Sequence, residues 1–251
     1  MASFLGTALF SLIMGLSIYI SLPLVMWKKT GRSATTLLNS VAIGILIFLI
    51  CDIFSNVASD IYAGGAFAGF GASPSLSAVF AISLLIGFLM LFIFENRSKK
   101  DLSPEKVSFM IAIGMGLQNL TEGLVFGSTS QSLGLFSGVA LVILIGFILQ
   151  NITEGFPIAA PFINHKDKKL GVMAMLFLIG GLPTVIGGIA GYYYSSTAIN
   201  IFFDGLAVGA ILYAILPMLK HQFRDIDYIK QRLVYGGIFF GFLIGFLVNL
   251  I

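Results

Sequence analysis

Apolar segments long enough to cross a bilayer recur eight times along this chain of 251 residues. A helix needs about 20 predominantly apolar residues to cross the ~30 Å hydrocarbon core. No water is present there, so backbone N–H and C=O groups must bond within the segment, and a helix achieves this. We therefore predict an all-α integral membrane protein with eight transmembrane helices. The predicted spans are residues 4–27, 34–59, 75–94, 107–127, 134–162, 170–194, 197–219 and 233–251.

The composition agrees with this class, because 58% of the residues are hydrophobic and only 10% are charged. Soluble domains carry about 25% charged residues. The first span lacks a basic leading segment and a small-residue cleavage site, so we interpret it as a retained span. The longest stretch between spans is the Gly-, Ala- and Ser-rich stretch 63–73, and we expect residues 1–251 to form a single transmembrane domain. One cysteine, Cys51, excludes an intramolecular disulfide.

The basic residues predict the orientation of the chain. All fourteen fall in the loops that follow the first, third, fifth and seventh predicted spans. The positive-inside rule then places those loops in the cytoplasm and both termini outside. Because each basic residue has this topological role, the net charge of +3 does not indicate a nucleic-acid partner. The fourteen are Lys28, Lys29, Arg32, Arg97, Lys99, Lys100, Lys106, Lys166, Lys168, Lys169, Lys220, Arg224, Lys230 and Arg232.

A polar hexapeptide occurs twice within these apolar spans, as QNLTEG at 118–123 and QNITEG at 150–155. Residues three and four apart share one face of a helix, so each copy forms a polar stripe. The two spans are joined by few residues and should be antiparallel neighbours. At 1.5 Å per residue, both stripes lie roughly 18 Å from the cytoplasmic edge, near mid-bilayer. The stripes consist of Gln118, Asn119 and Glu122, and of Gln150, Asn151 and Glu154.

Two carboxylates at this depth need compensation. Each costs roughly 2.5–3.5 kcal/mol on insertion scales, so the pair costs on the order of 5–7 kcal/mol. No Lys or Arg lies at that depth in the sequence, which leaves protons, partner amides or a cation. Two carboxylates and four amides offer oxygen ligands and a formal charge of −2, which matches one desolvated divalent metal ion. The alternative is that these side chains only join helices, with Glu protonated.

Other residues near the repeats have simpler interpretations. Gly123 and Gly155, which follow the two Glu residues, allow close helix contact, and Pro157 should bend the fifth span just past the repeat. Asp52 and Asp204 either line an external entrance or lie at interfacial helix ends.

The two histidines, His165 and His221, are expected to be solvated loop residues, because a lone histidine is a poor metal site.

Eight spans, external termini and adjacent fourth and fifth helices with paired motifs resemble the ZIP family of metal-ion transporters. Family members read HNxPEG in the fourth helix and, in one subgroup, QNxPEG in the fifth. The resemblance implies a divergent prokaryotic member in which the helix group containing helices four and five shifts against the rest. It also implies a metal site formed by Gln118, Asn119, Glu122, Gln150, Asn151 and Glu154.

Three departures from the family pattern affect the expected site. Gln118 stands at the fourth-helix histidine, Leu182 and Pro183 at the sixth-helix Glu-Pro, and Ile215 to Pro217 at the seventh-helix acid. These differences imply one metal position and weaker zinc selectivity. Imidazole favours zinc, copper and nickel, whereas carboxylate and amide oxygens suit manganese, magnesium and ferrous iron. We therefore do not assign the identity of the transported ion more narrowly than the zinc, iron and manganese class.

The expected function is transport of a divalent metal cation into the cytoplasm across a prokaryotic plasma membrane by one transport domain. The metal ion is the transported substrate, and no cofactor is expected; a homodimer is left open. We do not expect an enzyme: HExxH and GxxxxGK[ST] are missing, and neither histidine lies in a predicted span. A non-transporting ZIP-like metal sensor or membrane scaffold stays open, since family ligands are missing.

Overall fold

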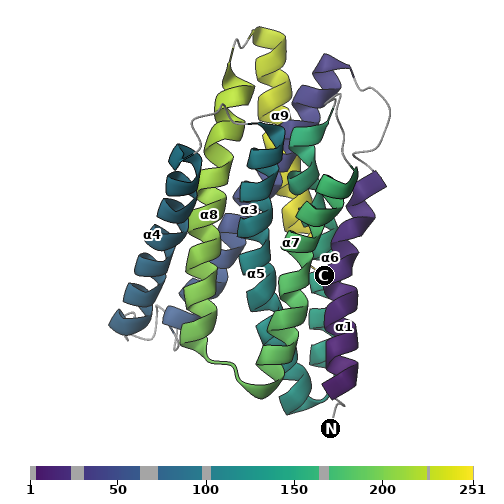
Figure 1. The fold of residues 1–251 in the computed structure, drawn as a ribbon, viewed down its shortest axis with the longest axis vertical. Coiled ribbons are helices and arrows are strands. Elements are labelled where there is room, and N and C mark those ends of the chain that lie inside the picture. The colour runs from purple at the N-terminus through teal and green to yellow at the C-terminus, as the bar shows by residue number, and fades with distance from the viewer. Residues whose placement is uncertain are drawn as a thin grey trace.

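The computed structural model of the chain describes residues 4–23, 31–62, 73–97, 103–163, 170–224 and 227–250 (Figure 1). Eight helical segments among them are long and apolar enough to cross a membrane, which confirms the predicted class and number of spans. The elements are α1 (Phe4–Ser17), the 3₁₀ helix η1 (Ile18–Ser21), α3 (Arg32–Ile61), α4 (Pro74–Arg97), α5 (Pro104–Leu133), α6 (Gly138–Ala159), the 3₁₀ helix η3 (Ala160–Phe162), α7 (Leu170–Tyr193), α8 (Thr197–Phe223) and α9 (Tyr228–Val248).

Several helices extend beyond the predicted spans because polar residues continue or cap them. α5 begins at Pro104, where the Ser103 Oγ accepts a hydrogen bond of 3.4 Å from the Lys106 N–H. α9 begins at Tyr228, five residues earlier than predicted, because Asp227 caps it. Hydrophobicity alone does not detect such caps. The predicted loop 63–73 lies outside the described residues except for Ser73.

A four-residue turn joins α5 to α6. Gly134 ends α5 with a φ of +95°, a conformation that side-chain-bearing residues rarely adopt. Three residues later the Ser137 Oγ accepts a hydrogen bond of 3.2 Å from the Ala140 N–H and caps α6. The two helices therefore run antiparallel and in contact, as predicted, which brings the two repeats onto neighbouring helices.

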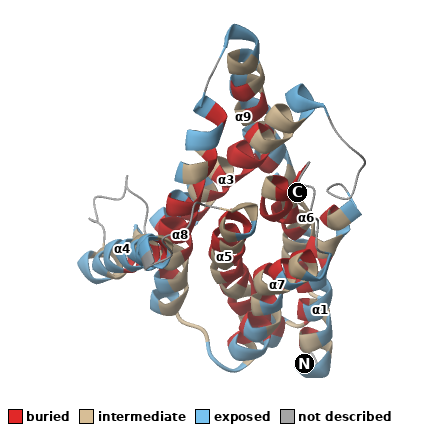
Figure 2. Ribbon diagram, turned by 45° about the horizontal axis from the view of Figure 1, so that its top comes forward, coloured by how far each residue is buried: buried red, intermediate tan, exposed pale blue. Residues whose placement is uncertain are grey.

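The helices associate in two groups. α1, α5, α6 and α7 pack with one another, and α5 and α7 form the most extensive pair. In the second group, α8 contacts both α4 and α3, and α3 packs along α9. The main contact between the groups is α5 against α8. Figure 2 shows α5 inside the bundle and α4 exposed at its edge. Within an apolar stretch of 18 residues in each helix, 72% is buried in α5 and 22% in α4.

Glycines set the closest helix contacts within each group. A Cβ added at Gly187 of α7 would lie 2.1 Å from the Leu120 carbonyl oxygen of α5. The same close approach occurs between α4 and α8, where a Cβ at Gly209 would lie 2.1 Å from the Leu84 carbonyl oxygen. Small residues let membrane helices pack backbone to backbone, and dispersion contacts then hold them together.

This packing predicts that Gly187→Ala destabilises the protein, because the added methyl group forces α5 and α7 apart. Overpacking costs about 1–3 kcal/mol, and about 1 kcal/mol moves the melting temperature by 2–4 °C in a chain of this size. We expect the melting temperature of the detergent-purified protein to fall by several degrees.

The matched control is Gly146→Ala in α6, because a Cβ at Gly146 meets nothing within 4 Å. Its melting temperature should not fall, since alanine favours helix more than glycine does. Equal melting temperatures for the two variants would contradict the packing described above.

Candidate metal site

The six repeat residues come from two neighbouring helices of one group. α5 carries one copy and α6 carries the other. Five of the six side chains are buried, with Glu122 only 5% exposed and Glu154 only 1% exposed. Gln150 is half-buried. Both carboxyl groups therefore lie inside the protein and away from the lipid-facing surface of their helices.

Hydrogen bonds order the side chains within each copy and between the copies. The Gln118 Nε2 donates to the Glu122 Oε1 at 3.2 Å, and the equivalent bond from Gln150 to Glu154 has the same length. Between the helices, the Asn119 Nδ2 donates to the Asn151 Oδ1 at 2.7 Å. The structure thus brings the two predicted stripes together.

Four buried oxygens of these residues have no hydrogen-bond partner. An unsatisfied buried polar atom costs about 1–3 kcal/mol, and a charged one costs more. The four side-chain amides carry eight N–H groups, and five of these donate to the carboxylates, the facing asparagine or the backbone. A cation, protons or added donors would complete the set. The four atoms are Gln118 Oε1, Asn119 Oδ1, Glu122 Oε2 and Glu154 Oε2.

Among the described residues, His, Cys, Asp and Glu side chains alone do not supply a complete set of metal ligands. Within the part of the chain that the structure describes, no three His, Cys, Asp or Glu side chains are grouped so that they could hold a metal ion. A metal bound at Glu122 and Glu154 would need amide oxygens as its further protein ligands. Such an all-oxygen set suits hard cations such as Mg²⁺ and Mn²⁺.

Two aspartates lie near this set without joining it. The half-buried Asp52 of α3 accepts a hydrogen bond of 2.6 Å from the Asn249 Nδ2 just past α9. The half-buried Asp204 of α8 lies beside Thr121 of α5. Both aspartates belong to the second helix group, and in their ionised form they would attract a cation towards the repeats.

α7 contributes a contact that the sequence did not predict. The Asn119 Nδ2 also donates to the Gly180 carbonyl oxygen at 2.9 Å, which ties α5, α6 and α7 together at one side chain. Pro183, three residues later, has no N–H for the helical bond to the Ile179 carbonyl, so this turn of α7 is weakened. Leu182 stands where the ZIP resemblance suggests a ligand, but it is 43% exposed and does not contribute one.

The α-helix of α6 ends shortly after the repeat. Pro157 lies inside α6, which stops being α-helical at Ala159 and continues as η3 with Pro161. A Cβ at Gly155 would lie 2.5 Å from the Ile18 carbonyl oxygen, so η1 packs directly beside the residue that follows Glu154. The predicted close contact at this glycine is present.

The histidines do not join the repeats. His165 lies outside the described residues, and His221 is an exposed residue of the last turn of α8, not a loop residue.

No protein-family model and no curated protein matches this chain.

Proposed function

We propose that this multi-pass membrane protein transports a divalent metal cation towards the cytoplasm through the α5–α6 site, as a divergent ZIP-like transporter. The observation that carries the proposal is the set of four unpartnered buried oxygens on the repeated hexapeptides. Two of them belong to carboxylates, and the described basic residues all lie at helix ends. A doubly positive ion would offset both the missing partners and the charge of −2.

The donor chemistry favours an ion at the hard end of the zinc, iron and manganese class. Each of the four unpartnered atoms of the repeats is a carboxylate or amide oxygen. Thiolate and imidazole ligands, which select zinc and copper, are missing from the six residues. Competition among manganese, ferrous iron, zinc and magnesium in the uptake assay would rank the ions.

The packing between the helix groups suits a relative movement. Within a group, glycines bring backbones together, as for Gly187 of α7 on Leu120 of α5. Between the groups, the glycine of α5 that faces α8, Gly114, meets the side chain of Ile211 first. The Ile211 backbone nitrogen would be 3.3 Å from that Cβ, so this contact is less close between backbones than the α5–α7 contact. We infer that α1, α5, α6 and α7 shift together against the other group, and carry the ion with them.

The first prediction of the transport proposal is loss of uptake in the double variant Glu122→Gln plus Glu154→Gln. The change keeps the side-chain volume but removes both negative charges that would bind the ion. In proteoliposomes loaded with a metal-sensitive dye, we expect the initial uptake rate of Mn²⁺ to fall at least about ten-fold, to the level of empty vesicles.

The control variant is Glu95→Gln plus Glu105→Gln, which removes two carboxylates near helix ends. Glu95 accepts a hydrogen bond from Tyr213, and glutamine retains an acceptor there; Glu105 is exposed. This variant should transport Mn²⁺ at the wild-type rate. Uptake by the Glu122 and Glu154 variant at the same rate as the control would refute the proposal.

A metal sensor or scaffold is the second candidate, favoured by the lack of a third acidic, His or Cys ligand among the described residues. A sensor would bind Mn²⁺ at Glu122 and Glu154, whereas a scaffold would not need to bind it. Neither would show uptake above empty vesicles in any form. Binding together with uptake distinguishes the transporter.

The second prediction concerns the movement. In a Cys51→Ser background, Gly114→Cys and Ala210→Cys would link α5 to α8, because a Cβ at Gly114 lies 3.6 Å from the Ala210 Cβ. That separation suits a disulfide. The same Cβ lies 2.7 Å from the Ile211 Cγ1, so the reduced form of this variant is the reference for its uptake. We expect oxidation to stop uptake and a reducing agent to restore it.

The matched pair is Thr7→Cys and Ser130→Cys, which links α1 to α5 inside one group. The two native hydroxyl oxygens lie 2.9 Å apart and are buried. Oxidation of this pair should leave uptake unchanged. Uptake that survives a complete α5–α8 disulfide would rule out the shift between the groups.

A further inference from the structure

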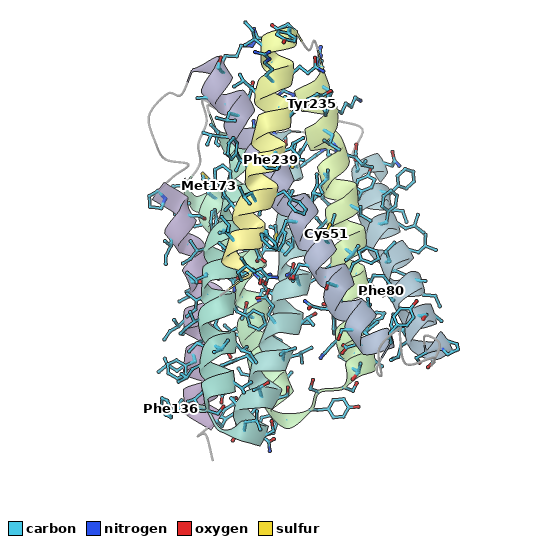
Figure 3. The ribbon with its side chains drawn as sticks, turned by 180° about the vertical axis from the view of Figure 1, so that it is seen from behind. Cys51, Phe80, Phe136, Met173, Tyr235 and Phe239 are labelled. Carbon is cyan, nitrogen blue, oxygen red and sulfur yellow. The ribbon has the colours of Figure 1, made fainter. Side chains whose placement is uncertain are left out.

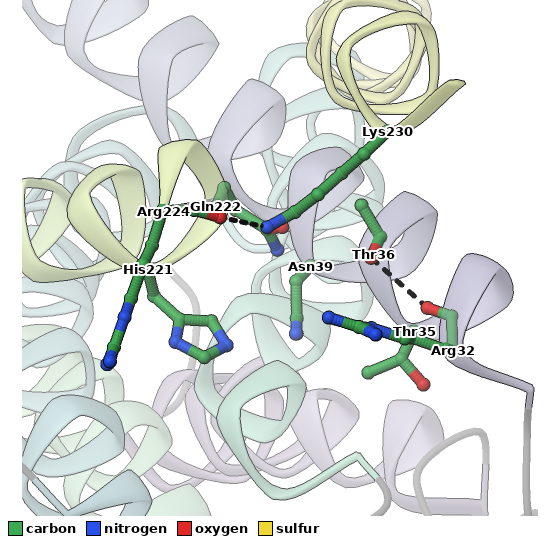
Figure 4. Close-up of a pocket in the computed structure, with 8 residues that line it drawn as sticks. All are labelled: Arg32, Thr35, Thr36, Asn39, His221, Gln222, Arg224 and Lys230. Carbon is green, nitrogen blue, oxygen red and sulfur yellow. Dashed lines mark hydrogen bonds between the residues drawn. The ribbon is translucent and has the colours of Figure 1, made fainter. Parts of the chain in front are cut away.

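A polar cavity lies at the end of the second helix group that carries basic residues. It has a volume of about 500 Å³, within the usual range for small-molecule sites. Figure 4 shows that its walls come from the start of α3, the end of α8 and the start of α9. The lining residues are Arg32, Thr35, Thr36, Asn39, His221, Gln222, Arg224 and Lys230.

The charge of the cavity is one-sided. Three of the eight lining residues are Lys or Arg, and none of the eight is acidic. The nearby Asp227 does not line the cavity, and its Oδ1 accepts from the Lys230 backbone N–H at 2.7 Å. Like charges gathered without a counter-charge repel one another and attract an anion. The cavity is therefore unsuited to a departing metal cation.

Hydrogen-bond donors are available inside the cavity. Gln222 is only 3% exposed and lines the cavity. Lys230 donates to the Arg224 carbonyl oxygen, which uses one of its three N–H donors. Figure 4 shows Arg32 and Lys230 extending from α3 and α9 towards Asn39 and Gln222. A buried amide beside guanidinium and ammonium groups is a donor set for phosphate oxygens.

The surface next to the cavity is apolar and exposed. Phe223 at the end of α8 and Tyr235 of α9 have ring centroids 6.2 Å apart. Phe239 follows Tyr235 one turn along α9 on the rear of the molecule (Figure 3), and both are more than half exposed. Tyr235 and Phe239 lie on the side of α9 away from α3, which packs against Gly237 and Gly241. An acyl chain from the cavity would reach them past Phe223, which follows Gln222 in the chain.

We propose that the cavity between α3, α8 and α9 binds a phosphate-bearing anion, and that the headgroup of an anionic phospholipid is its source. The phosphate would accept from Arg32, Lys230 and Gln222, and the acyl chains would follow Tyr235 and Phe239. Basic pockets between membrane helices on the cytoplasmic side commonly hold anionic headgroups. The proposal does not depend on metal transport, because none of these residues belongs to the repeats.

The test measures binding of fluorescent phosphatidylglycerol to the full chain in detergent, with phosphatidylcholine of equal chain length as reference. Arg32→Gln plus Lys230→Gln should weaken phosphatidylglycerol binding at least about ten-fold, since each basic residue contributes about 1 kcal/mol. Phosphatidylcholine binding should not change. Arg32→Lys plus Lys230→Arg keeps both charges and should retain most of the affinity, which separates loss of charge from loss of folding.

The matched control is Lys220→Gln plus Arg232→Gln, which removes two charges from the same helix ends. Neither residue lines the cavity, and the Arg232 guanidinium lies 4.4 Å from the centroid of the Tyr228 ring. Its binding should stay within about two-fold of wild type. Equal losses in both double variants, or a loss in neither, would overturn the proposal.

Inorganic phosphate and glycerol 3-phosphate identify the source of the phosphate. If neither competes at millimolar concentration, the acyl chains contribute to binding and the ligand is a lipid. If both compete in wild type but not in the Arg32 and Lys230 variant, the cavity takes a soluble phosphate anion through the same donors.

Discussion

Polar groups in a hydrocarbon layer cannot form hydrogen bonds with water, so they need partners within the protein, and this constraint governs the whole structure. The backbone meets it by forming helices. The side chains of the repeats find partners only in part. The two glutamines donate to the glutamates one helical turn further along. Asn119 donates to Asn151 and to the Gly180 carbonyl oxygen. These bonds orient the side chains and leave four buried oxygens without a hydrogen-bond partner. In the function that we propose, a divalent cation binds to these oxygens.

Helix packing places that set within one group of helices. Asn119 connects α5, α6 and α7, so the oxygens keep their arrangement if these helices move together. The glycines of α5 and α7 lock the same helices backbone to backbone. The basic cavity belongs to the other group, at the ends of α3, α8 and α9. A lipid bound there would restrict movement of the helix group that contains α3, α8 and α9 while the group that contains α5 and α6 shifts.

Much of the fold could be predicted because its signals are local. Apolar length predicts eight spans, and the short connection between the fourth and fifth predicts that they are antiparallel neighbours. The repeat spacing places Gln118 and Glu122 on one face, where the structure joins them by a hydrogen bond. The start of α9 was missed by five residues, because the Asp227 cap lies before the apolar run.

The remaining features depend on how helices rotate against each other, which one sequence does not reveal. Gly180 has no side chain that would mark its carbonyl as the acceptor for Asn119. Leu182 faces outward although its neighbour Gly181 packs on α1. The cavity at Arg32 and Lys230 joins residues almost 200 positions apart in the sequence.

The most direct measurement is anomalous diffraction at the manganese edge from crystals of the wild-type protein grown with Mn²⁺. Our account predicts an anomalous peak about 2.0–2.4 Å from carboxylate oxygens of both Glu122 and Glu154 and from at least one amide oxygen of Gln118 or Asn119. No peak between α5 and α6, with these oxygens bonded instead to protein donors or water, would contradict it.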